Sequence, residues 1–330
     1  MRKTGFRKIP HLKIIICCIL AAFLLVGGFL LLQNWEGKIG FFPEHETSDG
    51  TIEYNGIKYV PKGNIETFLV LGLDKYEGSS GADSYNNDKQ ADFLMLFIFD
   101  NDAKKYTAIQ INRDTMVDIN VLGVAGNKID TVYGQIALSH TYGNGKDLSC
   151  HNVANSISSL MMGISVNHYI SLTLDAVPVV NDLVGGVTVE VLDDFTGIDD
   201  SLVKGETVVL KGDQALTYVQ TRQGLEDSSN TTRMKRQQQY IKALHDAFNE
   251  CAAADDAFIV DASLKISGYM VSDRSVTQLQ VLAQKLTEYE FLGIENIAGE
   301  SVVGNKFMEF YPNKEEIKKM VIELFYTPKE

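Results

Sequence analysis

Short apolar runs and longer amphipathic segments alternate along the chain from Ile65 onward. Three short runs open this region, at residues 67–74, 92–100 and 106–114. Each run is rich in β-forming residues and is bounded by turn residues, as is typical of strands. Only the pentapeptide NDAKK separates the second run from the third. Because a parallel crossover needs a much longer connection, these two strands are predicted to be antiparallel neighbours.

This arrangement would gather polar residues at one end of the sheet. Antiparallel pairing places Asp92, at the start of the second strand, beside Arg113 and Asp114, at the end of the third. If the first strand runs in the direction of the third, its last residue, Asp74, arrives at the same end.

Segments with apolar residues at three- and four-residue spacing are predicted to form helices. They cover residues 151–164, 176–186, 232–252, 275–289 and 313–326. In the last helix Asn313 is the expected N-cap, with acidic residues in the first turn. Further strands are predicted at 187–192, 206–210 and 300–304. This mixture predicts an α/β fold, a three-layer α/β/α sandwich with a mixed central sheet.

A separate apolar segment precedes the folded region. Residues 14–32 are nineteen uncharged, almost wholly apolar residues, close to the roughly 20 that a membrane-spanning helix needs. The segment is too long for the apolar part of a cleaved signal peptide and lacks a cleavage motif, so it is interpreted as a signal anchor. Basic residues precede it and a more acidic stretch follows it, which predicts a cytoplasmic N-terminus. The preceding cations are Arg2, Lys3, Arg7, Lys8 and Lys13.

The chain is therefore divided into four parts. Residues 1–13 form a basic cytoplasmic N-terminus, 14–32 a single transmembrane helix, 33–63 a polar linker, and 64–330 one extracytoplasmic domain. The predicted location is the cell membrane, with the domain on the cell-wall side.

Charge and cysteine content exclude some classes of protein. The chain has a formal net charge of −13, and removing the basic N-terminus makes the exported part more acidic still, so nucleic acid is not an expected partner. Cys150 and Cys251 are the exported cysteines. A disulfide between them is compatible with an oxidising compartment, but two cysteines do not form a disulfide framework.

A cluster of cations stands out against this acidic background. Arg233, Lys235 and Arg236 lie within the segment NTTRMKRQQQYIKAL. On a helix, Arg233 and Gln237 share one face, with Arg236 beside them, and Arg222 lies just ahead in sequence. Arginine forks suit phosphate oxygens, and several together suit pyrophosphate. The alternative interpretation is a solvated basic helix face.

The acidic residues at the strand ends suggest a complementary role. Carboxylates such as Asp74 and Asp92 would repel a phosphate unless a hard cation lies between them, and Mg²⁺ is commonly held by one or two carboxylates and phosphate oxygens. Acid on one side and arginine on the other predict a Mg²⁺–pyrophosphate site. Walker, dinucleotide-binding, serine-hydrolase and zinc-protease motifs are absent from the sequence.

The sequence resembles the LytR-CpsA-Psr family of bacterial cell-envelope proteins. The resemblance covers most of residues 65–250 and, more loosely, the rest of the chain. It rests on seven segments in the family's order: FLVLGLD, ADFLMLFIFD, TAIQINRDTMVDI, NKIDTVYG, VVNDLVGGVTVEV, LKGDQALTYVQTR and TRMKRQQQ.

The resemblance implies a phosphotransferase with an apolar pocket for a polyprenyl chain. Such proteins move a glycopolymer, such as teichoic acid or capsule, from a polyprenyl-pyrophosphate carrier to peptidoglycan. Carried over by position, Asp74 and Asp92 match Mg²⁺ ligands and Asp114 matches an acid with a catalytic or supporting role. The positions that match pyrophosphate contacts are Arg113, which is also a catalytic candidate, Arg222, Arg233 and Gln237.

Three positions depart from the family pattern. Gln90 and Gln220 stand where the family usually has pyrophosphate-binding arginines and are therefore expected to contact the pyrophosphate as well. Asn230 replaces a common aspartate. Each lost charge-assisted contact could remove about 1.5 to 3 kcal/mol of binding. A second hypothesis is therefore a non-enzymatic envelope protein that binds lipid pyrophosphate or has a regulatory role.

Overall fold

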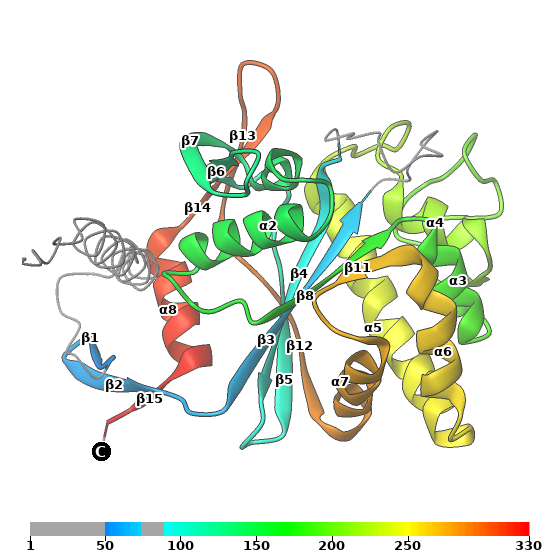
Figure 1. Cartoon of the computed structure of the whole chain (residues 1–330). Coiled ribbons are helices and arrows are strands. Elements are labelled where there is room, and N and C mark those ends of the chain that lie inside the picture. The colour runs from blue at the N-terminus through cyan, green and yellow to red at the C-terminus, as the bar shows by residue number, and fades with distance from the viewer. Residues whose placement is uncertain (1–49, 74–88, 330) are drawn as a thin grey trace, which may run out of the picture. The chain divides into compact units, whose positions relative to one another are not determined.

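The computed structural model of the chain describes residues 50–73 and 89–329 (Figure 1). At its centre is a six-stranded mixed sheet with the strand order β11-β8-β3-β4-β5-β12. β4 (Ala91–Asp100) lies antiparallel to both β3 (Ile65–Leu73) and β5 (Lys105–Gln110). The predicted antiparallel neighbours are therefore confirmed, and β3 runs in the direction of β5.

The outer strands extend this sheet on both sides. β8 (His168–Thr173) pairs parallel with β3, and β12 (Glu290–Asn296) pairs parallel with β5. The short β11 (Met270–Ser272) adds an antiparallel edge beside β8. Both parallel and antiparallel pairs occur, so the predicted mixed central sheet is confirmed.

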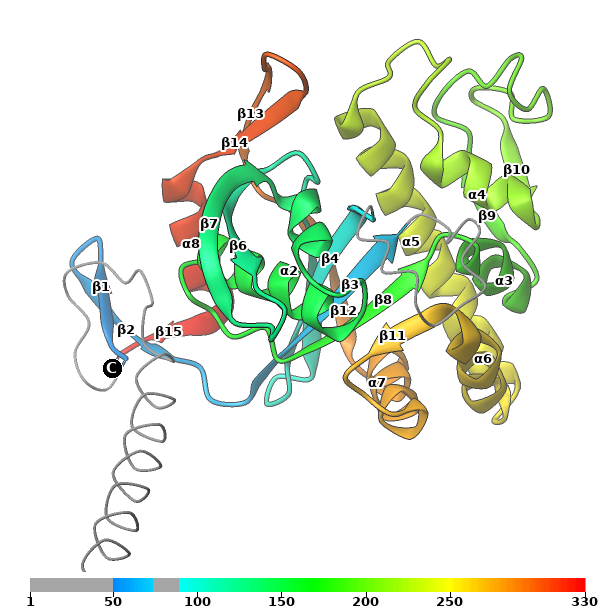
Figure 2. The same cartoon turned by 45° about the horizontal axis from the view of Figure 1, so that its top comes forward.

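Helices cover both faces of the sheet (Figures 1 and 2). The 3-10 helix η2 (Ile136–Tyr142), α2 (Asp147–Leu160) and α8 (Lys314–Phe325) contribute to the core on one face. The other face lies against α3 (Ala176–Leu183), α5 (Asn230–Ala254), α6 (Phe258–Ile266) and α7 (Val276–Glu288). The result is a three-layer α/β/α arrangement.

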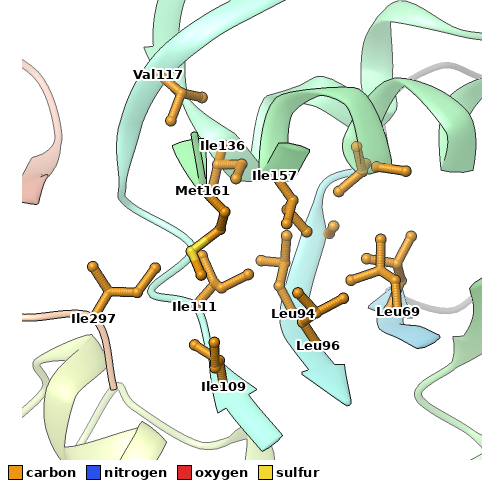
Figure 3. Packing of buried hydrophobic residues seen from close by; sticks show 14 of the residues in the cluster. Leu69, Leu94, Leu96, Ile109, Ile111, Val117, Ile136, Ile157, Met161 and Ile297 are labelled. Atoms are coloured by element: carbon orange, nitrogen blue, oxygen red, sulfur yellow. The ribbon is translucent and has the colours of Figure 1, made fainter. Parts of the chain in front are cut away.

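The alternation of side chains along each strand explains the two layers. In β3, Leu69 and Leu71 belong to the main core, whereas Phe68 and Val70 point to the opposite face. Leu94, Ile109 and other aliphatic residues complete the main core beneath α2 (Figure 3).

Smaller strand pairs surround the sheet. β6 (Met116–Leu122) pairs with β7 (Lys128–Gln135), and β13 (Gly299–Val303) pairs with β14 (Met308–Pro312). β9 (Val187–Glu190) pairs with β10 (Thr207–Leu210), and the short helix α4 (Asp213–Gln220) follows.

The predicted linker contains ordered structure at its C-terminal end. Here β1 (Ile52–Tyr54) and β2 (Ile57–Pro61) form a hairpin, and β2 also pairs with β15 (Tyr326–Pro328). Asn55 and Gly56 occupy the turn with φ values of 52° and 76°, as the common two-residue hairpin turn requires. The linker prediction is therefore wrong for this hairpin, because Asn55 and Gly56 close the turn and β2 pairs with β15 of the domain.

The remaining N-terminal predictions, residues 1–13, 14–32 and 33–49, lie outside the described residues. Within the described ranges, no helix is both long and apolar enough to cross a membrane. Cys150 and Cys251 are both free in the structure, so the disulfide does not form.

The predicted helices are present with shifted ends. The N-cap of α8 is confirmed, because the Asn313 side chain accepts hydrogen bonds from the backbone N–H groups of Glu315 and Glu316. The helices α4 and α6 were not predicted. Both are shorter than ten residues, which gives a periodic pattern little room to repeat.

Candidate functional site

The polar residues predicted at the strand ends do meet. The Arg113 guanidinium, just after β5, donates from Nη1 to Asp92 Oδ1 at the start of β4 and from Nη2 to Gln90 Oε1. Its Nε lies 3.6 Å from Asp114 Oδ1. The sheet therefore brings together Gln90, Asp92, Arg113 and Asp114. The other predicted metal ligand, Asp74, lies outside the described residues.

Asp114 is the buried carboxylate of this group, with 6% of its surface exposed. Its backbone N–H donates to Asn112 Oδ1 at 2.9 Å, and Gln135 Nε2 donates to its Oδ1 at 2.9 Å. Burial raises the pKa of the Asp114 carboxyl above its ordinary value, and the charges of nearby arginines partly oppose that rise. Those arginines are Arg113, Arg222 and Arg233.

Helix α5 brings the cationic side of the site. It begins after the N-cap Ser229, whose side chain accepts from the Thr232 backbone N–H at 3.2 Å. Arg233, in the first turn, is only 5% exposed. Its Nε and Nη2 donate to Asn230 Oδ1 at 3.1 and 2.6 Å, and Nη2 reaches the Asp92 carbonyl oxygen at 3.4 Å.

Asn230 connects this arginine to the strand side of the site. Its Nδ2 donates to Asn112 Oδ1 at 2.7 Å, and the same Asn112 oxygen accepts from the Asp114 backbone. The residue that replaces the family aspartate therefore orients Arg233 without neutralising it.

The cluster carries more positive charge than negative charge near Asp114. Burial, together with repulsion from Arg222 and Arg113, lowers the pKa of Arg233 to about 10. The half-buried Arg222 side chain forms no hydrogen bond or ion pair with the part of the chain that the structure describes. Guanidinium groups held this close to one another form a binding site for an anion with several oxygens.

Arg236, which the sequence places beside Arg233 on the helix, has a structural role. It is 1% exposed and donates to Asp193 Oδ2 and to the Thr221 carbonyl oxygen. Its guanidinium carbon also lies 5.3 Å from the centre of the Phe195 ring. Arg236 therefore fastens α5 to the segment that carries β9, β10 and α4. Arg233, Arg236 and Gln237 are all buried, so the alternative of a solvated basic face is wrong.

The two predicted glutamine contacts separate in the structure. Gln237 is buried, accepts from Gln110 Nε2 at 2.8 Å and donates to the Val219 carbonyl oxygen at 3.1 Å. Gln220, at the end of α4, is exposed. Lys235 is exposed as well, as expected from its place on the helix.

An apolar cavity of about 400 Å³ lies beside the cluster, between the sheet and the helices α3, α5, α6 and α7. Sheet residues such as Val70 and Met95 face Leu244 of α5 and Leu282 of α7 across it. Gln237, one turn after Arg233, is one of the few polar lining residues, and Phe93, next to Asp92, is another lining residue. The apolar cavity is therefore adjacent to the arginine cluster, because Gln237 and Phe93 line the cavity close to Arg233 and Asp92.

The donors available for a metal are hard oxygens. The Asp92 carboxylate and the Gln90 amide oxygen both face Arg113, and oxygen donors of this kind suit Mg²⁺. In the described ranges, no group of three or more His, Cys, Asp or Glu side chains could hold a metal on its own. A cation here would need ligands from its substrate, as Mg²⁺ at phosphate sites usually does.

Sequence reasoning missed the amides that organise this site. Asn112 and Gln135 hold the backbone and the side chain of Asp114, and Asn230 holds Arg233. Asn112 sits directly beside the predicted pair Arg113 and Asp114, which was the available signal. Gln135 comes from a hairpin that was not predicted.

Fold and site together define an α/β domain with a partly buried arginine cluster at the edge of an apolar cavity. A sequence model of the LytR_cpsA_psr family matches residues 44–324. The chain therefore belongs to the LytR-CpsA-Psr family.

Named relatives match over most of the chain. A polyisoprenyl-teichoic acid–peptidoglycan teichoic acid transferase, TagU of Oceanobacillus iheyensis, is 27% identical over 312 residues, which cover 91% of this chain and 89% of the relative. TagV of Bacillus subtilis, a transferase with the same descriptive name, is 26% identical over 79% of this chain and 65% of its own length.

Solved structures have the same fold. The structure of B. subtilis TagV aligns with a TM-score of 0.59 and 22% identity, covering 79% of this chain and 95% of that one. TagT bound to LIIa-WTA aligns with a TM-score of 0.59 and 20% identity, covering 85% and 95%.

The buried Arg236 and its exposed neighbour Lys235 should contribute very differently to stability. Arg236→Ala leaves the Asp193 carboxylate without its partner and should lower the free energy of unfolding by about 3 to 5 kcal/mol. Lys235→Ala, the exposed neighbour on the same helix, should change it by less than about 0.5 kcal/mol. Denaturant unfolding of the purified chain measures both. Equal effects of the two substitutions would contradict the structural role of Arg236.

Proposed function

We propose that this protein is a phosphotransferase that moves a glycopolymer, such as teichoic acid, from a polyprenyl-pyrophosphate carrier to peptidoglycan. The observation that carries the proposal is the cluster of the half-buried Arg113 and Arg222 with the buried Arg233, at the edge of an apolar cavity. A polyprenyl pyrophosphate has the same two parts, a polyanionic head and a long hydrocarbon tail. Family membership and the activities after which the relatives are named support the same activity.

In this proposal the cluster binds the pyrophosphate head. Arg222 has donors without partners among the described residues, and Arg233 is held by Asn230 with its charge only partly offset by Asp114. Phosphate oxygens would relieve the mutual repulsion of these guanidinium groups. The prenyl chain would lie in the cavity beyond Gln237, where its burial is favourable.

Asp114 is the proposed general base. The acceptor hydroxyl oxygen attacks the phosphorus that carries the glycopolymer, its proton passes to Asp114, and the bond to the bridging oxygen breaks. The polyprenyl phosphate leaves with the electron pair of that bond. A raised pKa makes Asp114 a better proton acceptor than an ordinary surface carboxylate. The arginines stabilise the negative charge on the phosphoryl oxygens.

Asp92, together with Asp74 outside the described residues, is the proposed Mg²⁺ site. A bound Mg²⁺ would neutralise phosphate charge during transfer. Asp92 also accepts a hydrogen bond from Arg113. The same carboxylate would therefore bind both the Mg²⁺ and the arginine.

Residues 14–32 are proposed to anchor the protein in the cytoplasmic membrane, with the domain outside. The support is the length and flanking charge of that segment in the sequence. This placement would put the cavity in the compartment where peptidoglycan is found.

The non-enzymatic hypothesis has one structural observation in its favour. Gln90, in place of a family arginine, accepts a hydrogen bond from Arg113 and thereby holds part of that guanidinium within the protein. A protein of this kind would bind the lipid pyrophosphate without turnover. The retained Asp114 favours the enzyme, because simple anion binding does not need a buried carboxylate among the arginines.

Arg233 should determine donor affinity. Arg233→Ala is expected to weaken binding of polyprenyl pyrophosphate by roughly 1.5 to 3 kcal/mol, or about tenfold to more than a hundredfold, because a charge-assisted contact is lost. Calorimetry on the full chain in detergent measures the change. Arg233→Lys keeps the charge without the fork and should fall in between, whereas Lys235→Ala is the matched control and should bind as the wild type does. Wild-type affinity in Arg233→Ala would remove the cluster from donor binding.

Transfer should depend on pH through Asp114. Because the pKa of this group is raised, it becomes protonated at a higher pH than an ordinary aspartic acid, near 3.9, and the rate should fall as pH drops through that raised value. Asp114→Asn should lower the rate by roughly 10² to 10⁴-fold and remove this acid limb, with donor binding retained. An unchanged pH–rate profile in Asp114→Asn would exclude the base role.

Transfer should also require a divalent cation. Chelation of the full chain with EDTA is expected to stop transfer, and added Mg²⁺ should restore it. Asp92→Asn should raise the Mg²⁺ concentration needed for half-maximal rate, since one carboxylate ligand is lost. Full activity in the presence of chelator would remove the metal from the proposal.

The proposed topology can be checked in cells. A reporter fused after Glu330 should be exposed on the outer side of the membrane and accessible to protease added to intact protoplasts. A protected C-terminus would contradict the anchoring proposal.

A further inference from the structure

Two tyrosines are exposed beside the site. Tyr133, on β7, has 59% of its surface exposed, and Tyr311, on β14, has 40%. A tyrosine ring has an apolar body and a polar tip, and exposed rings of this kind are common in recognition surfaces. The proposed donor site does not use either residue.

The two rings belong to one surface with two carboxylates. Tyr133 lies directly opposite Asp118 in the β6–β7 register, so both side chains face the same way. The Tyr311 hydroxyl donates to Glu309 Oε2 at 2.6 Å. Burial raises the pKa of Tyr133, and the charges of Asp118 and Glu309 raise it further, which places Glu309 near both tyrosines. Asp118, Tyr133, Glu309 and Tyr311 are called the Tyr133–Tyr311 surface below.

This surface is continuous with Asp114. Gln135, two residues after Tyr133 on the same face of β7, donates from Nε2 to Asp114 Oδ1 at 2.9 Å and to the Met308 carbonyl oxygen at 2.7 Å. The backbone N–H of Phe310, between Glu309 and Tyr311, donates to the Asp114 carbonyl oxygen at 2.8 Å. The strands that display the tyrosines are therefore fixed to the residue that accepts the proton in the proposed reaction.

Charge divides the neighbourhood of Asp114 into two sides. The side formed by Arg113, Arg222 and Arg233 attracts phosphate. The side formed by the tyrosines carries Asp118 and Glu309, which repel a phosphate-rich polymer. Carboxylates accept hydrogen bonds from hydroxyl groups, and the tyrosine rings offer flat apolar faces to the C–H faces of sugars. The chemistry of this side fits a ligand that is rich in hydroxyl groups and carries no phosphate.

We propose that the Tyr133–Tyr311 surface binds the acceptor, the sugar strand of peptidoglycan, and directs one of its hydroxyl groups toward Asp114. This inference rests on the proposed function and identifies the second substrate's binding site within it. Donor and acceptor then approach Asp114 from sides of opposite charge.

The test is equilibrium binding of peptide-free peptidoglycan glycan strands to the full chain in detergent, without any donor. Tyr133→Ala and Tyr311→Ala are each expected to weaken strand binding about tenfold, because a stacked aromatic contact is lost. Tyr133→Phe and Tyr311→Phe keep the ring and should retain most of the affinity. Phe307→Ala is the matched control: this residue is 65% exposed, lies just before β14 and is outside the surface. It should bind strands as the wild type does.

Three results would overturn the inference. In the first, the wild-type chain does not bind the strands. In the second, both alanine variants bind them as tightly as the wild type does. In the third, Phe307→Ala loses as much affinity as the tyrosine variants. A change in oligomeric state of the tyrosine variants, measured by sedimentation with strand binding intact, would instead assign the surface to self-association and also overturn the inference.

The same variants separate this inference from the proposed function. Polyprenyl-pyrophosphate binding, measured in parallel, should be unchanged in both alanine variants. In transfer assays the variants should raise KM for the glycan strands and leave KM for the donor unchanged. Strand binding that depends on the tyrosines, in a chain that transfers nothing, would support the surface and contradict the transferase.

Discussion

The site depends most on the burial of Arg233 close to Arg113 and Arg222, beside the buried carboxylate of Asp114. Burying a charge is costly unless hydrogen bonds and opposite charge compensate. Here Asn230 supplies the hydrogen bonds, and in the described part of the chain Asp114 and the Arg113 partner Asp92 supply two negative charges against the three of Arg113, Arg222 and Arg233. The depressed pKa of Arg233, about 10, reflects this incomplete compensation. A polyanion is the ligand that would complete it.

The fold supplies the positions that this cluster requires. The antiparallel order of β3, β4 and β5 brings the start of β4 and the end of β5 to one end of the sheet. Helix α5 carries Arg233 and Gln237 on the same face, and Arg233 reaches the Asp92 carbonyl oxygen at the start of β4. Arg236 fixes the helix through Asp193 and Thr221. The same helix then lines the apolar cavity with Leu244 and other residues, so one element connects a head-group site to a hydrocarbon site.

Much of this arrangement follows from the sequence, because local rules determine it. The five-residue connection NDAKK requires an antiparallel pair, which places Asp92 beside Arg113 and Asp114. The spacing of four between Arg233 and Gln237 puts them on one helix face. The apolar pocket was expected for a different reason. Seven segments follow the order of the family, and the resemblance to that family implies a pocket for a polyprenyl chain.

Other features depend on contacts that no local pattern encodes. Arg236 is buried by Asp193 and Thr221, which lie in irregular segments far from it in sequence. Gln220 and Gln237 were both assigned to the pyrophosphate site, yet one is exposed and the other is hydrogen-bonded within the protein. Gln135 reaches Asp114 only because the β6–β7 hairpin folds beside β14. Tertiary packing, which periodicity does not report, decides each of these cases.

The most direct measurement is a crystal structure of the folded domain with polyprenyl pyrophosphate bound. The account predicts phosphate oxygens within hydrogen-bonding distance of Arg222 and Arg233, and the prenyl chain in the cavity lined by Met95, Leu244 and Leu282. A pyrophosphate bound away from these arginines, or a prenyl chain outside the cavity, would contradict it.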